Sequence, residues 1–184
     1  MSNNKSNELL DYMNYIHRLA ENRIKKEYSN SGPERAAIVF NELFSNSNNI
    51  FRLYAGSLSG EISSKILYTS GLRQFLQKKQ TKLKILLEEI THFSENKNPI
   101  LFSLLKNHKE KVVIKHSKVS PIDREGNEIH FSVGDDSMYR VEIDRTNFKA
   151  RGSFNNKNEA KDLNELFDKI FDSEENSSPT NLLS

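Results

Sequence analysis

Two kinds of hydrophobic pattern alternate along the chain after residue 49, and their order restricts the fold more than any other feature. Short apolar runs at 50–55, 83–87 and 112–114 predict strands. Helical stretches separate these runs, one reaching Lys79 and one covering 99–108. Because strands and helices alternate along the chain, we expect parallel strands joined by helical crossovers.

A second block of strands follows a loop rich in turn-forming residues. Segments 129–133 and 138–143 alternate between apolar and polar residues, and a turn at 134–136 joins them, so they predict an antiparallel pair. An amphipathic helix over 157–172 completes the series. The whole order predicts an α/β fold, a mixed β-sheet flanked by helices on both faces.

Two helices are expected before the first strand. Apolar residues recur at three- and four-residue steps over 7–28, and a second helix is predicted from Pro33 to Phe44. We therefore expect an N-terminal helical extension over 1–46, an α/β domain over 47–172 and a flexible tail over 173–184. The apolar stripe of the first helix needs a partner surface, either its own sheet or another chain.

Composition excludes several classes of protein. The chain has 184 residues, enough for one domain with a core, and no cysteine, so disulfides and thiolate metal sites are excluded. No apolar stretch has the length of a secretory signal or a membrane span, so we expect a cytoplasmic protein with no membrane partner. A net charge of +2 is too balanced to indicate nucleic-acid binding without a local basic patch.

Gly152-Ser153-Phe154-Asn155 is the first hint of chemistry. It follows strand-like residues and precedes a helix, and its backbone, hydroxyl and amide groups can hold a phosphate. The alternative is a tight turn in which Asn155 caps the next helix.

Histidine is the candidate nucleophile or acid–base group. His17, His92 and His108 fall in polar helical or loop sequence and are expected to be solvated or capping residues. His116 and His130 both flank the hairpin that leads to the Gly-Ser-x-Asn segment.

These elements together resemble the phospholipase D superfamily, in which a His-x-Lys-x-x-x-x-Asp strand is followed by Gly-Ser-x-Asn. The resemblance covers about 36–172 and is carried mainly by four segments, at 50–54, 83–87, 130–136 and 152–155. It implies a histidine that attacks phosphorus, a lysine and an asparagine that hold the phosphoryl oxygens, and no metal or other cofactor. It also implies a homodimer, since two halves of the motif, often from two chains, form one site.

Two registers compete for the His-x-Lys-x-x-x-x-Asp strand. His116, Lys118 and Asp123 match every letter, but Pro121 argues against a central strand there. We prefer His130, which lies on a better strand but puts Ser132 at the lysine position and Ser137 at the aspartate position. This register is similar to degenerate members of the family.

Without the lysine, a phosphoryl group would lose the main cation that offsets its charge in the transition state. Arg140, or Lys118 from a neighbouring strand end, is the expected replacement. Arg140, Glu142 and Asp144 share one face of their strand, either as an ion-paired sheet face or as a row of site residues in which Glu142 orients the imidazole. A metal bound by these carboxylates with Asp135 or Asp136 is the less favoured alternative.

The catalytic set implied by the preferred register is therefore His130, Ser153 and Asn155, with Arg140 and Glu142. For nucleic acid, the candidates are lysines at strand and helix ends, which either line a groove for the phosphate backbone or are ordinary surface residues: Lys82, Lys84, Lys111 and Lys115.

Two functions follow. The favoured one is a degenerate binding or assembly subunit of a prokaryotic nucleic-acid-processing or defence complex, beside a partner such as a nuclease or ATPase. The other is a metal-independent phosphodiesterase, most plausibly a nuclease, with His130 as nucleophile in a dimeric site. A purely structural protein would be indicated if His130 and Asn155 lay more than about 10 Å apart, beyond any shared hydrogen-bonded group.

Overall fold

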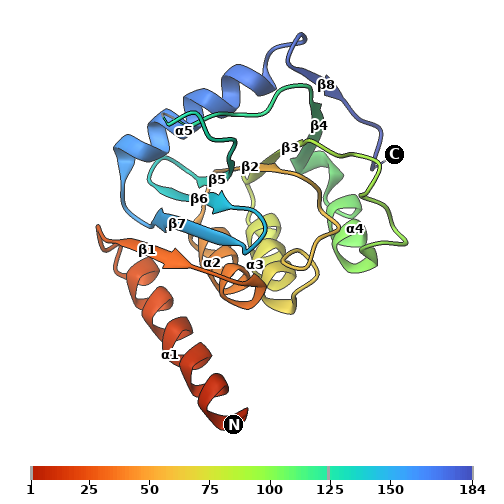
Figure 1. Ribbon diagram of the computed structural model, residues 1–184. Helices are drawn as coiled ribbons and strands as arrows, with labels where there is room; N and C mark the ends of the chain where they lie inside the picture. Colours follow the sequence, from red (N-terminus) through yellow and green to blue (C-terminus); the bar gives the residue numbers. More distant parts are fainter. Residues whose placement is uncertain (1, 124, 184) are drawn as a thin grey trace.

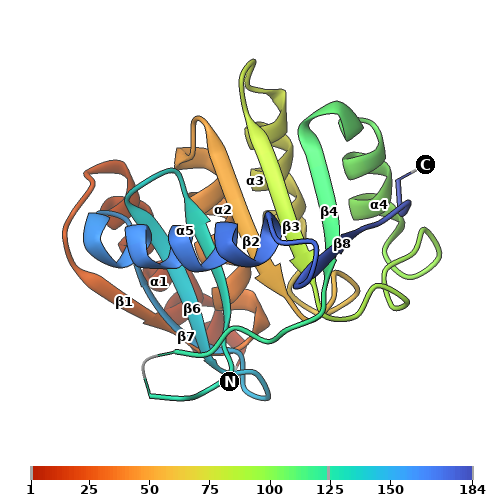
Figure 2. The same ribbon diagram turned by 90° about the horizontal axis from the view of Figure 1, so that it is seen from above.

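A computed structural model describes residues 2–123 and 125–183, with the backbone alone for residues 2–5. The chain forms one eight-stranded mixed sheet in the order β1-β7-β6-β5-β2-β3-β4-β8. Helices α2, α3 and α4 cover one face, and α5 crosses the other, as Figures 1 and 2 show. The predicted α/β class, a mixed sheet with helices on both faces, is confirmed.

Three parallel strands form one half of the sheet, namely β2 (Ile50–Ala55), β3 (Lys82–Leu87) and β4 (Val112–Ser117). Helix α3 (Ile66–Gln77) makes the first crossover, and α4 (Pro99–Lys106) with a short 3₁₀ turn, η1 (Lys109–Lys111), makes the second. Since the strands are parallel, their carboxyl ends lie at the same edge, where open α/β sheets usually place their sites.

The other half of the sheet is antiparallel. Strand β5 (His130–Gly134) pairs with β2 and forms the predicted hairpin with β6 (Met138–Asp144). Strand β7 (Lys149–Ser153) follows, and β1 (Glu27–Asn30) completes this edge. His130 therefore begins its strand next to the carboxyl end of β2.

Each face of the sheet has its own aromatic core. Phe44 of α2 packs on Phe51 of β2, with ring centroids 4.4 Å apart. On the opposite face, Phe131 of β5 meets Phe167 of α5 at 6.3 Å, edge to face. Helix α5 (Lys157–Phe171) lies close to its predicted bounds. Because both faces are buried, the central strands read as apolar runs.

The N-terminal region differs from the sequence expectation. Helix α1 (Ser2–Glu21) ends well before residue 28, and Arg23 turns the chain with a positive φ of 49°. Strand β1 then pairs with β7, and α2 (Pro33–Asn46) packs on the sheet, so a boundary at residue 46 does not separate two bodies. Only α1 projects from the rest of the molecule in Figure 1.

Two other segments also depart from expectation. Residues 57–65 form turns rather than helix, because glycine and serine occur throughout that segment and favour turns. Instead of a free tail, the C-terminal segment forms β8 (Ser177–Pro179), which pairs antiparallel with β4 and buries Ser177. Within the described residues, no helix combines the length and the apolar character that a membrane crossing requires.

Candidate functional site

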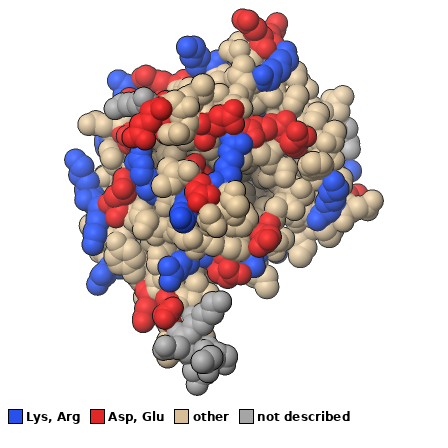
Figure 3. Space-filling view, viewed as in Figure 1, with Lys and Arg blue, Asp and Glu red and all other residues tan. Residues whose placement is uncertain are grey.

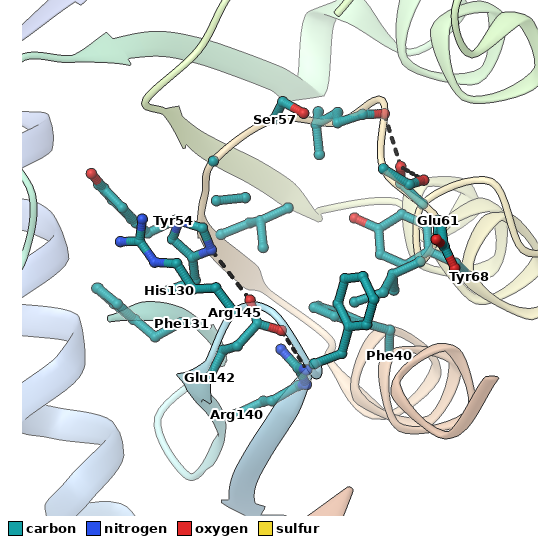
Figure 4. A pocket seen from close by; sticks show the side chains of 18 residues that line it. Phe40, Tyr54, Ser57, Glu61, Tyr68, His130, Phe131, Arg140, Glu142 and Arg145 are labelled. Atoms are coloured by element: carbon teal, nitrogen blue, oxygen red, sulfur yellow. Dashed lines mark hydrogen bonds and ion pairs between the residues drawn. The ribbon is translucent and has the colours of Figure 1, made fainter. Parts of the chain in front are cut away.

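His130 lies between two carboxylates at the carboxyl edge of the parallel strands. Its Nδ1 is 3.2 Å from Oε2 of Glu142, the residue that pairs with it on β6. Its Nε2 is 3.2 Å from Oε2 of Glu88, which follows β3. Gly56, just after β2, allows the ring to come close, since a Cβ there would lie 3.0 Å from the imidazole Cε1. The predicted contact between Glu142 and the imidazole is present (Figure 4).

Two arginines complete the network. Arg145 donates from Nη1 and Nη2 to the two oxygens of Glu88, each at 3.1 Å. Arg140 donates from Nη2 to Glu142 at 3.0 Å and from Nε to Asn30 at 3.3 Å. The Tyr54 hydroxyl also donates to Glu88 at 3.0 Å. Three potential cations thus share two carboxylates; Arg140 and Glu142 are buried, whereas Glu88 and Arg145 are partly exposed.

The two carboxylates favour the charged form of the imidazole. Burial opposes the charge of His130, but the hydrogen bonds that the imidazole donates to Glu142 and Glu88 outweigh that cost and raise the pKa of the imidazole. The hydrogen bond with His130 lowers the pKa of Glu88 to about 2, although burial acts in the other direction. Burial also opposes ionisation of Glu142, yet His130 and Arg140 hold its pKa below the usual value.

In this geometry neither ring nitrogen of His130 offers a free lone pair to a phosphorus atom. A nucleophile needs a free lone pair, whereas an imidazolium with both N–H groups donated to carboxylates has none. Attack would first require Glu88 to leave Nε2 and a proton to leave the ring. This geometry therefore favours a hydrogen-bond donor over a nucleophile at His130.

The lysine position of the motif holds no cation. Ser132 is buried with 1 % of its surface exposed, and its hydroxyl has no hydrogen-bond partner within the described part of the chain. Of the two expected replacements, Arg140 is committed to Glu142, and Lys118 points elsewhere, donating to the Glu174 carbonyl at 2.8 Å. The sequence gives no signal for Arg145, which binds Glu88, the carboxylate that also contacts the imidazole. Only the fold brings Arg145 to Glu88.

The Gly-Ser-x-Asn segment lies at the other end of the sheet. His130 is level with Glu142 and Ala150, whereas Ser153 lies three residues further along β7. At about 3.3 Å per residue and 4.8 Å per strand spacing, the Cα atoms of His130 and Ser153 are separated by about 14 Å. Asn155, past the end of β7, donates to the Arg23 carbonyl at 2.7 Å, so it lies beyond the separation of about 10 Å from His130 that favours a purely structural role for the Gly-Ser-x-Asn segment.

The local contacts of this segment are those of a turn. The Ser153 hydroxyl accepts from the backbone N–H of Asn155 at 3.2 Å, and Asn156, not Asn155, caps α5. Gly152 is required for close packing, since a Cβ would lie 2.2 Å from the Tyr139 carbonyl oxygen and 2.4 Å from the Tyr28 hydroxyl. The chain that does reach the His130 end is Asp144, the last residue of β6, with the loop Arg145-Thr146-Asn147 after it; this segment shares only its final asparagine with Gly-Ser-x-Asn.

The alternative register is divided among separate contacts. His116 on β4 has Nε2 3.1 Å from the Glu88 carbonyl oxygen. Lys118 is bound to the C-terminal segment, and the Asp123 carboxylate accepts backbone N–H bonds from Glu125 and Asn127 within its own turn. The side chains of His116, Lys118 and Asp123 therefore contact separate groups and do not converge on one site.

The carboxylates considered for a metal are also separated. Asp135 accepts N–H bonds from residues 48–50 and lies at the turn between β5 and β6, opposite the end that carries Glu142 and Asp144. Among the described residues, no group of three or more potential ligands converges on one point.

The four candidate lysines do not form one surface. Lys84 lies 3.1 Å from Asp168, and Lys115 donates to the Phe171 carbonyl at 2.5 Å, both on the α5 face. Lys111 donates to the carbonyls of Leu76 and Lys78 near the end of α3. Lys82 is exposed at the start of β3.

No family model and no curated protein matches the sequence. Solved structures do match its fold. TrmBL2, described as an archaeal chromatin protein with a novel mode of DNA binding, aligns with a TM-score of 0.56 and 13% identity over 97% of this chain. The match spans 62% of the length of TrmBL2.

Two further structures define the class of fold. NucT from Helicobacter pylori aligns with a TM-score of 0.57 and 10% identity, over 84% of this chain and 99% of that one. Phosphatidylserine synthase from Haemophilus influenzae Rd KW20 aligns with a TM-score of 0.54 and 7% identity, over 86% and 40% of the two chains. Both are phospholipase D-like proteins, so this chain shares the phospholipase D-like fold.

Proposed function

We propose that this protein is a non-catalytic phospholipase D-like subunit that binds nucleic acid and assembles with partners in a prokaryotic nucleic-acid-processing or defence complex. One observation carries the proposal: both ring nitrogens of His130 are held by carboxylates, at 3.2 Å each. The residue that the family would use as nucleophile serves here as the centre of an ion network.

The surroundings of His130 support the same conclusion. Ser132 replaces the motif lysine, and removing a cation or donor that stabilises transition-state charge typically costs about 3 kcal/mol of barrier. Ser153 and Asn155 are engaged in their own turn, away from the imidazole. A phosphodiester placed at His130 would therefore meet neither a nucleophile nor the expected phosphate holders.

Nucleic-acid binding is proposed for another surface. On the face seen in Figure 3, acidic and basic side chains are interspersed. The amino ends of the parallel strands instead carry three exposed lysines: Lys79 after α3, Lys82 on β3 and Lys109 in η1. Cations of this kind bind phosphates without reading sequence. The likeness of the fold to TrmBL2, a protein described as binding DNA, supports this part of the proposal.

A nuclease assay with EDTA present tests the loss of chemistry. Single-stranded DNA, double-stranded DNA and RNA are incubated with the wild type, with His130→Ala and with a matched control, His92→Ala, which changes an exposed loop histidine. We expect no cleavage by any of the three. Cleavage by the wild type and by the control, but not by His130→Ala, would overturn the proposal.

Fluorescence anisotropy with labelled DNA tests the binding role. The triple variant Lys79→Glu, Lys82→Glu, Lys109→Glu should bind at least about tenfold more weakly than wild type and show a shallower dependence on salt. The matched control reverses three exposed lysines elsewhere, Lys25, Lys26 and Lys157. Equal losses in both triple variants would remove the assignment of this surface.

The contact between Glu142 and His130 favours a second candidate, the metal-independent phosphodiesterase acting as a homodimer. In that function, a phosphodiester would displace Glu88 and leave Glu142 to orient the imidazole. Glu88→Gln should then increase cleavage in EDTA, whereas the non-catalytic subunit stays inactive after the same substitution. Sedimentation equilibrium gives the oligomeric state that this candidate requires.

A further inference from the structure

A groove lies on the α5 side of the sheet. Its volume is about 620 Å³, and α5, β6, β7 and the loop before β5 bound it. Figure 2 shows α5 crossing this face, with the loop below it in that view. Because Val141 and Ile143 alternate with Arg140 and Glu142 along β6, the groove and the His130 network lie on opposite faces of the sheet.

The floor of this groove is an exposed apolar surface. Ile143 of β6 is 60 % exposed and Ile122 of the loop is 56 % exposed, and both line the groove. Leu166 of α5 is partly buried, and the buried Val141 and Leu163 line the same groove. Single exposed apolar residues are ordinary, but exposed apolar side chains gathered in one groove mark an interaction site.

Carboxylates lie on both walls of the groove. Two come from the loop and two from α5, namely Asp123, Glu125, Glu159 and Asp162. Arg151 is the only cation among the described residues of the lining, and it already binds Glu159 at 3.0 Å and Glu27 at 3.1 Å. With Glu27 included there are five carboxylates and one guanidinium, and counting Arg124 from the sequence of the loop still leaves five against two. We call this surface the acidic groove, since its net charge is negative.

Both walls are formed by regular local structure. In the described part of the loop, the backbone N–H of Asp123 donates to the Asn127 carbonyl at 2.9 Å. On the other wall, four residues within 159–166 line the groove at three- and four-residue intervals, so they share one face of α5. The acidic groove is thus formed before a partner binds, as ligand sites usually are.

Charge complementarity and shape indicate the partner. Acidic walls repel the phosphates of nucleic acid and attract lysine and arginine. An amphipathic helix places an apolar stripe in a groove of this kind and carries its cations on both sides of the stripe, where they reach the two walls. An extended segment would instead turn every second side chain away from the floor. We infer that the acidic groove binds a basic amphipathic helix of a partner protein.

This inference rests on the assembly part of the proposed function, to which it adds a surface and the chemistry of the partner. The surface differs from the one proposed for nucleic acid, because Lys79, Lys82 and Lys109 lie at the amino ends of the parallel strands and line no part of the acidic groove. The two kinds of binding are therefore tested separately.

Fluorescence anisotropy on the full chain tests the inference with a labelled peptide of about 12 residues, in which leucine and lysine follow helical amphipathic order. One control peptide has glutamate in place of lysine, and another has serine in place of leucine. We expect saturable binding of the leucine–lysine peptide, with both controls at least about tenfold weaker. Absence of saturable binding, or equal binding of the serine–lysine peptide, would overturn the inference.

Substitutions at exposed positions locate the peptide. Ile143→Ser removes an apolar contact of the floor and Glu125→Lys reverses a charge of one wall, so each should weaken peptide binding about tenfold. The matched controls, Ile100→Ser and Glu95→Lys, change exposed residues of the same types outside the groove and should bind like wild type. Because all four side chains are exposed, the fold should survive, which circular dichroism checks. Unchanged affinity in both groove variants, or equal losses in the groove variants and their controls, would place the peptide elsewhere and overturn the inference.

Two further measurements separate this inference from its alternatives. Ile143→Ser should bind DNA like wild type, and the triple lysine variant should still bind the peptide. A wild type that binds DNA but not the peptide would overturn this inference and leave the nucleic-acid surface, whereas one that binds the peptide but not DNA would support it and remove that surface. Sedimentation equilibrium tests a second copy as the occupant: a dimer that Ile143→Ser dissociates would show that the same chain covers the groove and would overturn the inference.

Discussion

The two ends of the β5–β6 hairpin are built on opposite principles. At the His130 end, charged groups are buried together and neutralise one another through direct hydrogen bonds. At the Gly152 end, backbone groups and short polar side chains form a tightly packed turn. Residues that match a sequence motif therefore indicate chemistry only if the fold brings them to the same end of the sheet.

Removing Glu142 should have the largest effect on this comparison. Glu142→Ala leaves Arg140 and His130 without their buried counter-charge, and breaking a buried pair from one side typically costs about 3 kcal/mol or more. Urea denaturation gives the free energy of unfolding. Glu128→Ala, whose carboxylate is exposed near Arg145, is the control and should cost less than about 0.5 kcal/mol. Similar losses in both variants would mean that the His130 end is not held by its buried charges.

Gly152→Ala tests the packed turn at the other end. The new Cβ would lie 2.2 Å from the Tyr139 carbonyl oxygen, so we expect a loss of about 2 kcal/mol in the free energy of unfolding. Gly60→Ala is the matched control, because nothing lies within 4 Å of the added Cβ there. A Gly152→Ala protein as stable as wild type would contradict the close approach.

The His130 end should contribute to the pH dependence of stability on both the acid and the alkaline side. The lowered pKa of Glu88, about 2, means that its contribution is complete above about pH 4.5 and is lost as the pH falls towards 2. The raised pKa of His130 means that its contribution is complete below about pH 6.5 and is lost as the pH rises through the folded-state pKa.

Urea midpoints measured from pH 2 to pH 9 check both windows. Between pH 6 and pH 9, the wild type should lose more stability than His130→Gln, which has no imidazole to titrate. Asn155→Ala, at the other end of the hairpin, should follow the wild-type profile. A His130→Gln profile with the wild-type alkaline slope would place the titrating group elsewhere.

The smallest expected effect distinguishes two neighbouring asparagines. Asn156→Ala removes the side chain that caps α5 and should cost about 1 kcal/mol. Asn155→Ala removes a partly buried bond to the Arg23 carbonyl and should cost about half as much. Thermal unfolding of the two variants ranks them, and the reverse order would restore Asn155 as the cap that the sequence suggested.

Local sequence pattern was enough to predict many of the strands and helices. Strand β2 has the bounds 50–55 that the apolar run predicts, because Asn49 and Gly56 interrupt it on both sides. The β5–β6 hairpin follows from alternation around a turn. Strand β1 was not predictable in this way, because Glu27–Asn30 is polar and becomes a strand only through pairing with β7. Tertiary context decided that segment.

The candidate site could be predicted only in part. The sequence places Glu142 twelve residues from His130 across a two-strand turn, so their contact follows from register. Glu88 and Arg145 join the imidazole from the ends of β3 and β6, and no local pattern links positions 57 residues apart. The prediction for Gly152-Ser153-Phe154-Asn155 failed for a different reason. The segment matches the family motif in sequence, but β7 places it at the end of the sheet opposite His130.

The short strand β8 also determines how this sheet can grow. Pro179 pairs with Lys115 and has no backbone N–H to offer, and the strand is only three residues long, so this edge is a poor template for another chain. Strand β1, at the other edge, contains no proline and leaves one side of its backbone unpaired within the described chain. If copies of this protein join by extending the sheet, during assembly or during aggregation, they join through β1.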